Sequence, residues 1–225
     1  MKKLFFAVAI IFMTSGLNSC SNSQDEFGLN ESNLTSQNVS SLKEKSIQNI
    51  AKDLVEVSKR MSINPDLILD NYDGFTADLD NGVVFSSESV QMNEFTQIFD
   101  TRFGMNQSAT QEFYNIIYNN RDFFVKNDPQ GTLLRDAVIE EFKTQIADTN
   151  GNTQKLIFSS IFEISGSTNC GYGVMAAFAD TAISAVVTAV TAPTGIGAVA
   201  GAASTAASYA TLVYRAAKCK GRNYH

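Results

Sequence analysis

The chain has 225 residues, of which 44% are hydrophobic, and a formal net charge of −6. This composition is typical of a folded globular protein and excludes a disordered chain. The charge is uneven, because residues 20–165 hold 11 basic and 22 acidic residues, whereas residues 166–225 hold four basic residues and one acidic residue. Nucleic-acid binding needs clustered Lys and Arg to neutralise phosphates, so nucleic acid is excluded as an expected partner.

The first 19 residues are organised like an export signal. Lys2 and Lys3 precede an apolar run over residues 4–13, which has the length of a signal-peptide core and is about half as long as a membrane-spanning helix. Residues 17–20 then read Leu-Asn-Ser-Cys. This segment resembles the lipobox of bacterial lipoproteins, in which the cysteine is lipidated and becomes the first residue of the mature protein.

This resemblance implies a signal peptide over residues 1–19, a lipid on Cys20 and a membrane as the partner that the lipid contacts. Ser21 directly after the cysteine favours the outer membrane, by analogy with enteric lipoproteins. Residues 23–26, Ser-Gln-Asp-Glu, resemble the short acidic export tag of surface lipoproteins of the Bacteroidota. The periplasmic face and the cell surface both stay open as locations. Two or three acyl chains suffice as an anchor without a further membrane segment.

Residues 20–40 are rich in Ser, Asn and Gln and predict a flexible tether. Order is expected to begin with a capping box at residues 41–44, Ser-Leu-Lys-Glu, which starts a helix that ends at about Arg60. The apolar positions of this helix recur at helical spacing and comprise Ile47, Ile50, Ala51, Leu54, Val57 and Met61.

A second, short helix is predicted to start at Asn64-Pro65, a cap followed by proline, and to end at Leu69. The pattern after Leu69 is ambiguous as far as residue 88. Here Asp-Asn-Gly at residues 80–82 lies between two short apolar runs, residues 75–79 and 83–85, and this arrangement predicts a small β-hairpin.

Four more helices are predicted between residues 92 and 166, so that residues 41–166 form an acidic α-helical domain with a bundle architecture. One ends at Gly104, one is capped by Ser108 with Gln111 and ends before Pro129, one starts at Thr132 and stops near Asn150-Gly151, and one runs from Leu156 to Gly166. We interpret the many phenylalanines as core residues because they lie on the apolar stripes of these helices.

The C-terminal residues 167–225 differ in composition, being rich in Ala, Val, Thr and Gly. Residues 172–191 and 197–218 are arms of similar length on either side of an Ala-Pro-Thr-Gly turn, which predicts a helical hairpin. The expected fold class is therefore all-α, a multi-helix bundle followed by an Ala/Gly-rich hairpin. Asp180 in the middle of the first arm favours a hairpin packed in water, while conditional membrane insertion stays open as an alternative.

The three cysteines are divided between two expected roles. Lipidation of Cys20 leaves Cys170 and Cys219, one near the outer end of each arm. Because an envelope compartment outside the cytoplasm permits disulfides, we expect these two cysteines to be bridged. The bridge would close a loop of roughly 50 residues, for which chain entropy predicts a stabilisation of about 4 kcal/mol.

Sequence patterns assign no catalytic residue, cofactor or metal site. The only histidine is His225, which excludes histidine-based triads and HExxH zinc sites. The S-x-x-K of residues 40–43 coincides with the expected helix cap, and the acidic loops at 78–82 and 148–152 have their glycines misplaced for an EF-hand. The glycines of residues 194–201 lack the strand that a dinucleotide loop must follow. A hydrolase that uses only paired carboxylates stays open.

The sequence therefore predicts a lipid-anchored protein of the cell envelope with a binding or structural role, and another envelope protein is the partner considered beside the membrane. The alternative is a membrane-active hairpin carried by a lipoprotein. Residues 170–174, Cys-Gly-Tyr-Gly-Val, resemble the Tyr-Gly-Asn-Gly-Val box of pediocin-like bacteriocins without its asparagine. That resemblance implies a bacteriocin-like, membrane-active C-terminal segment.

Overall fold

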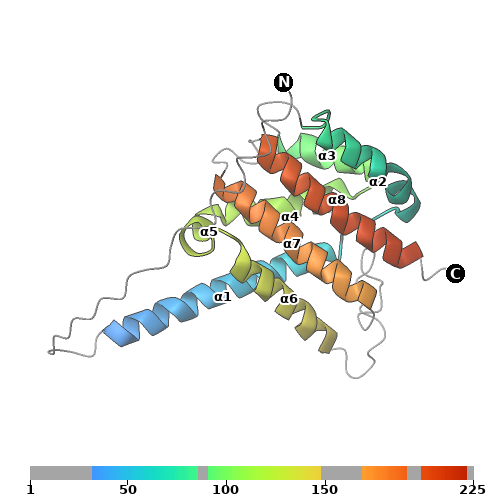
Figure 1. Ribbon diagram of the computed structural model, residues 1–225. Coiled ribbons are helices and arrows are strands. Elements are labelled where there is room, and N and C mark those ends of the chain that lie inside the picture. The colour runs from blue at the N-terminus through green and yellow to red at the C-terminus, as the bar shows by residue number, and fades with distance from the viewer. Residues whose placement is uncertain (1–31, 86–90, 148–168, 192–198, 222–225) are drawn as a thin grey trace, which may run out of the picture. The chain divides into compact units, whose positions relative to one another are not determined.

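The computed structural model describes residues 32–85, 91–147, 169–191 and 199–221, and these residues form eight α-helices and no strand. The expected all-α class is confirmed. Residues Asn38–His225 form one compact unit that includes the hairpin (Figure 1). The helices are α1 Ser32–Ser58, α2 Pro65–Asp80, α3 Met92–Phe103, α4 Gln107–Asn119, α5 Arg121–Asn127, α6 Thr132–Ala147, α7 Asn169–Thr191 and α8 Val199–Gly221.

Helix α1 begins earlier than its sequence predicts. It starts at Ser32, so residues 32–40 are helical where a tether was predicted, and the capping box at residues 41–44 lies inside the helix. Once packing has formed a helix, each further residue adds a hydrogen bond at little cost, so Ser- and Asn-rich residues extend it. The predicted apolar face is confirmed, because all six of its members are buried: Ile47, Ile50, Ala51, Leu54, Val57 and Met61.

The start of α2 is confirmed, with Pro65 as its first residue and the side chain of Asn64 accepting a hydrogen bond from the Leu67 N–H at 3.2 Å. The predicted end at Leu69 is wrong, because the helix runs to Asp80.

The predicted β-hairpin over residues 75–85 is also wrong. Asp80, Asn81 and Gly82 end α2 instead, and Gly82 takes the left-handed conformation with φ of +66°. Phe75 decides the outcome, since it is fully buried and its ring lies 5.0 Å from that of Phe103. A helix places Phe75 on the same face as the buried Ile68, whereas a turn signature alone does not distinguish a hairpin from a helix end.

Helix α3 ends at Gly104, which is left-handed with φ of +61°, as predicted. The cap of α4 differs from the prediction, because Asn106 rather than Ser108 caps the helix and accepts from the N–H groups of Ser108 and Ala109. The stripe predicted to continue to Pro129 is broken at Asn120 into α4 and α5. Helix α6 starts at Thr132 as predicted, while the helix predicted over residues 156–166 lies outside the described residues.

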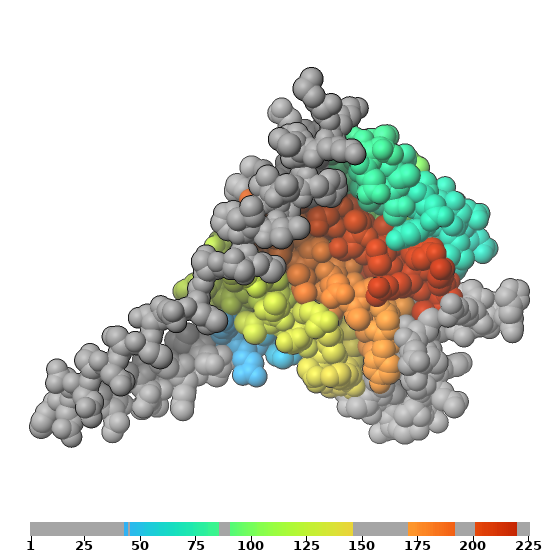
Figure 2. Space-filling view, in the orientation of Figure 1, coloured from blue at the N-terminus to red at the C-terminus, as the bar shows by residue number. Residues whose placement is uncertain are grey.

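The predicted helical hairpin is confirmed by α7 and α8, which pack against each other along antiparallel paths (Figure 1). Helix α7 also packs on α4, α5 and α6, and α8 packs on α2. In the space-filling view the outer face of the hairpin lies between α2 and α6 (Figure 2). The hairpin is therefore part of the core and not an appendage to it.

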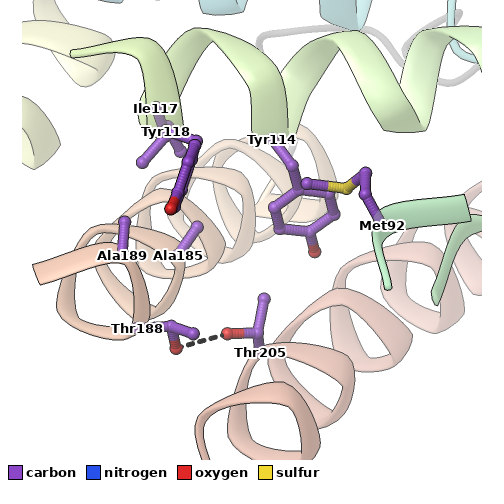
Figure 3. A pocket seen from close by; sticks show the side chains of 8 residues that line it. All are labelled: Met92, Tyr114, Ile117, Tyr118, Ala185, Thr188, Ala189 and Thr205. Atoms are coloured by element: carbon purple, nitrogen blue, oxygen red, sulfur yellow. Dashed lines mark hydrogen bonds between the residues drawn. The ribbon is translucent and has the colours of Figure 1, made fainter. Parts of the chain in front are cut away.

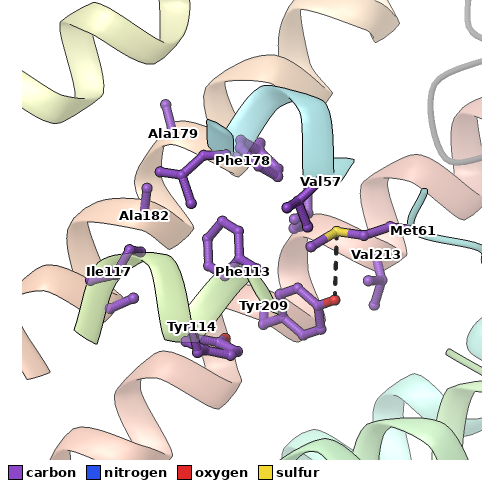
Figure 4. Packing of buried hydrophobic residues seen from close by; sticks show 14 of the residues in the cluster. Val57, Met61, Phe113, Tyr114, Ile117, Phe178, Ala179, Ala182, Tyr209 and Val213 are labelled. Atoms are coloured by element: carbon purple, nitrogen blue, oxygen red, sulfur yellow. Dashed lines mark hydrogen bonds between the residues drawn. The ribbon is translucent and has the colours of Figure 1, made fainter. Parts of the chain in front are cut away.

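The core of the bundle is aromatic, which confirms the interpretation of the phenylalanines. Phe113 on α4 lies at its centre, with ring centroids 5.3 Å from Phe178 on α7 and 5.1 Å from Tyr114 (Figure 4). Edge-to-face contacts of this kind add to the free energy of burial. The fully buried phenylalanines are Phe75, Phe95, Phe99, Phe103, Phe113, Phe124, Phe142 and Phe178.

Candidate functional site

Some of the predicted site residues lie outside the described part of the chain, and the others lie in the helices of the hairpin. Cys20 lies outside the described residues, as does His225. Cys170 is in the first turn of α7, and Cys219 is buried in the last turn of α8. The structure therefore bears on the hairpin and on the joint between the hairpin and the bundle, where the polar groups of the core gather.

The register of the hairpin places residues 170 and 219 at the same end. Three hydrogen bonds define this register: Thr188 Oγ1 to Gly201 O at 3.2 Å, Thr181 Oγ1 to Ser208 O at 3.2 Å, and Arg215 Nη1 to Gly173 O at 3.4 Å. From one contact to the next, the position on α7 moves toward the start of that helix by about as many residues as the position on α8 moves toward its end. One further turn beyond Gly173 and Arg215 therefore brings position 170 opposite Cys219.

The two helices lie close together at Gly201. A Cβ atom added there would lie 2.8 Å from Thr188 Cγ2, a separation that real side chains do not adopt. Glycine at this position therefore lets the backbone of α8 rest against the side chain of Thr188. Of the glycines of residues 194–201, Gly201 lies within the described residues, and its role is this helix contact.

Hydroxyl groups pair with each other between the two arms. Thr188 Oγ1 lies 2.8 Å from Thr205 Oγ1, and Ser184 Oγ lies 2.7 Å from Ser208 Oγ. A buried hydroxyl without a partner is costly, and these contacts satisfy four hydroxyls of the hairpin within the hairpin itself. Sequence reasoning missed this arrangement, although the spacing of Thr181, Ser184 and Thr188 at three and four residues was a detectable stripe.

Tyr209 connects the hairpin to the bundle. Its hydroxyl lies 2.8 Å from Thr110 Oγ1 on α4 and 3.8 Å from Met61 Sδ (Figure 4). The side chain is fully buried, and this burial raises the pKa of the phenol because the charged form loses its hydration. Tyr209 is thus a neutral hydrogen-bonding group in the centre of an aromatic core.

Tyr114 lies beside Tyr209 and differs from it in the hydrogen bonding of its hydroxyl. Its side chain is buried, and within the described part of the chain its hydroxyl has no hydrogen-bond partner. Burial raises the pKa of this phenol too. The ring borders a cavity of about 10 Å³ between α4 and the two hairpin helices (Figure 3).

Two arginines bind the outside of the hairpin. Arg121 Nε donates to the backbone carbonyl of Ala189 at 2.8 Å, near the end of α7. Arg135 Nε lies 3.2 Å from Asp180 Oδ1, so the acidic residue in the middle of α7 is at the surface and paired with α6. Both contacts hold the first arm of the hairpin against the bundle.

The loop residues considered for calcium have structural partners. Asp78 forms an ion pair with Arg102 at 2.8 Å, and Asn81 ends α2. Residues 148–152 lie outside the described residues. Among the side chains that the structure describes, no group of three or more His, Cys, Asp or Glu gathers in a way that would hold a metal ion.

An open groove of about 400 Å³ lies between α1 and α6. Its apolar lining includes Ile47, Ala137 and the exposed Leu133, and charged residues such as Lys43 and Asp136 border it. An apolar centre with a polar rim is the usual composition of a protein-binding surface.

The fold and these sites define an all-α bundle whose core includes a hydroxyl-paired helical hairpin. No protein-family model, no curated protein and no solved structure matches the chain. Among the described helices, Gly171–Thr191 of α7 has the length and composition to cross a membrane, and 61% of its apolar window is buried inside the fold.

Proposed function

We propose that this protein is a lipoprotein of the cell envelope, held on the outer membrane by lipid on Cys20, with a binding or structural role. The observation that carries the proposal is the order of charged segment, apolar run and Leu-Asn-Ser-Cys within the first 20 residues. The described helices start at Ser32, after Cys20 in the chain, which is the order that a lipidated first residue followed by a folded domain requires.

A disulfide between Cys170 and Cys219 belongs to the same proposal. The antiparallel register supports it, since positions 170 and 219 fall opposite each other at the base of the hairpin. The bridge would join the start of α7 to the end of α8 and stabilise the core element of the fold, which fits an oxidising compartment.

Lipid attachment is tested by growing cells with an alkyne analogue of palmitate and isolating the protein. We expect the wild-type chain to carry the label and to fractionate with membranes. Cys20→Ala should lose the label and the membrane association, while Cys219→Ala, as the matched control, should keep both. An unlabelled wild-type protein would overturn the proposal.

The groove between α1 and α6 is where we place the binding role, with another envelope protein as the partner. A photo-crosslinking residue in place of Leu133, which is 41% exposed, should capture that protein in intact cells. Val125 on α5, which is 47% exposed, provides the control position outside the groove. Equal capture at both positions, or capture at neither, would contradict a binding role for the groove.

A membrane-active hairpin is a second candidate function, and one observation favours it. Four hydroxyls, those of Ser184, Thr188, Thr205 and Ser208, are paired inside the hairpin, so the two arms would carry these groups into a bilayer with hydrogen bonds already formed. Among the described residues, only a few polar side chains hold the hairpin in the bundle. They include Tyr209, Arg121 and Arg135.

Dye release from anionic vesicles by the full mature chain tests this second function. Val187 on α7 is exposed, so Val187→Asp should fold normally and yet oppose insertion of the hairpin. Val125→Asp on α5 is the matched control. Release that only Val187→Asp abolishes would support insertion, and no release by the wild-type chain would exclude it.

A further inference from the structure

The groove between α1 and α6 combines an apolar floor with a charged rim. Ile47 of α1 and Ala137 of α6 are buried in it, and Leu133 of α6 lies beside them with 41% of its surface exposed. The hollow has a volume of about 400 Å³. A large apolar side chain exposed in such a hollow gains free energy when another apolar surface covers it.

The charged groups that line the groove are mostly negative. Glu44, Asp136 and Glu140 supply three carboxylates, against the single ammonium group of Lys43. Asp136 and Glu140 are exposed and lie one helical turn apart on α6, so their side chains follow the same edge of the groove.

The cations that neighbour the two α6 carboxylates are not among the described residues that line the groove. Arg135 lies 3.6 Å from Asp136, but it also contacts Asp180 on α7 at 3.2 Å. Lys143 lies 2.7 Å from Glu140, one turn further along α6. Ion pairs between exposed groups such as these are weak, so the carboxylates can exchange partners with an incoming cation.

An amphipathic helix with basic residues fits both features of the groove. Its apolar side chains form a stripe that can enter between two helices, and Lys or Arg beside the stripe meets the acidic rim. A second copy of this chain would place the same acidic rim against itself, which like charges oppose. A small apolar ligand would match the floor alone.

We propose that this groove binds a cationic amphipathic helix of another envelope protein. The apolar stripe of that helix contacts Leu133 and the floor beside it, and its Lys or Arg side chains pair with Asp136 and Glu140. This proposal rests on the proposed function, because it names the class of partner for the groove that the binding role uses.

The experiment measures the binding of fluorescent peptides to residues 20–225 with Cys20→Ala, which carry no lipid. The first peptide consists of Leu and Lys with Leu at helical spacing, over about five turns of helix. The second has the same composition in scrambled order, so that it lacks the apolar stripe. We expect the first peptide to bind about tenfold more tightly than the second.

Substitution of Leu133 tests the apolar floor. Leu133→Ser should weaken binding of the amphipathic peptide about tenfold, because the buried contact of one large apolar side chain is lost. Val125→Ser on α5 is the matched control, since Val125 is 47% exposed and lies outside the groove. That variant should bind the peptide as the wild type does.

Charge reversal tests the acidic rim. Asp136→Lys with Glu140→Lys should weaken binding of the Leu/Lys peptide and allow a Leu/Glu peptide of the same pattern to bind. Asp70→Lys with Asp73→Lys changes the net charge by the same amount at two exposed positions of α2, outside the groove. This control should keep the preference of the wild type.

Three results would overturn the proposal. The first is equal binding of the amphipathic and scrambled peptides, and the second is an unchanged preference after charge reversal at the rim. The third is a dimer in gel filtration that Leu133→Ser dissociates, because a second copy would then occupy the groove. If photo-crosslinking at Leu133 captures a protein in intact cells and the Leu/Lys peptide does not bind, this proposal fails and the proposed function stands.

Discussion

The helices α1–α6 and the hairpin α7–α8 fill one core with two different kinds of side chain. In the bundle, large aromatic rings meet in tilted and edge-to-face pairs, as Phe75 does with Phe99 and Phe103. Within the hairpin, small residues bring the backbones together, as Gly201 does at Thr188. The comparison shows that ring packing and close backbone approach are alternative ways to bury a helix.

The two kinds of packing should respond in opposite ways to substitution. A region filled by large rings loses stability when a side chain is made smaller, because a cavity remains. A region held by close approach loses stability when a side chain is made larger, because the helices must separate. Four predictions follow from this contrast and from the groups at the joint.

The largest effect is expected for Phe99→Ala in the aromatic core. Phe99 is fully buried, and its ring lies 5.1 Å from Phe95 and 4.8 Å from Tyr209. We expect the free energy of unfolding, measured by urea denaturation, to fall by about 3–5 kcal/mol. Phe123→Ala on the partly buried edge is the control and should cost much less. Equal losses would contradict the assignment of Phe99 to the centre of the core.

A strong loss of stability is also expected at alkaline pH. Burial raises the pKa of Tyr114 and of Tyr209, so the folded protein keeps two phenol protons that the unfolded chain releases above pH 10. Stability is therefore fully present below about pH 10 and falls as the pH rises toward the folded pKa. The slope is about 1.4 kcal/mol per pH unit for each tyrosine.

Absorbance at alkaline pH provides the measurement for this effect. The two buried phenols should ionise only together with unfolding. The double variant Tyr114→Phe with Tyr209→Phe should remove that part of the pH dependence. Ionisation of all tyrosines in the folded state would show that the two phenols are accessible to water.

A smaller effect is expected for Gly201→Ala in the hairpin. The added methyl group would lie 2.8 Å from Thr188 Cγ2, so we expect a loss of about 1–3 kcal/mol. Gly173→Ala on α7 meets open space and should be neutral or stabilising by up to about 1 kcal/mol. Thr188→Ser removes the clashing methyl group and should restore part of the loss. Similar behaviour of the two alanine variants would contradict close packing at Gly201.

The smallest effect is expected for Asp128, in the loop that connects α5 to α6 beside α7. The buried carboxylate of Asp128 accepts from the Leu134 N–H at 2.9 Å and the Leu133 N–H at 3.2 Å, and so caps α6. We expect Asp128→Ala to cost about 0.5–2 kcal/mol. Asp122→Ala, whose side chain is fully exposed, is the control. A null result for Asp128 would show that α6 is capped in another way.

The sequence was sufficient where an apolar stripe and a cap agreed. Gly104 ends α3 and Asn64 starts α2 as predicted, because each side chain or backbone preference acts locally. The sequence was misleading at residues 80–82, where Asp-Asn-Gly suits a hairpin and a helix end equally. There the choice depends on Phe75, whose burial requires helices that are distant in sequence.

The candidate site was predictable only in part. The hairpin followed from the lengths of its arms, and the opposition of residues 170 and 219 followed from the turn between them. The contacts of Tyr209 with Thr110 and of Thr188 with Thr205 depend on the rotation of each helix about its axis, which spacing alone does not determine. The Tyr114 hydroxyl, which has no partner among the described residues, has no sequence signal for the same reason.

We propose that export and lipidation place this bundle in the cell envelope, and the mass of the amino-terminal peptide of the native protein tests this proposal. The account predicts a first residue Cys20 that carries a thioether-linked diacylglycerol, with residues 1–19 removed. A native chain that still begins at Met1, or that has been cut without acylation of Cys20, would contradict it.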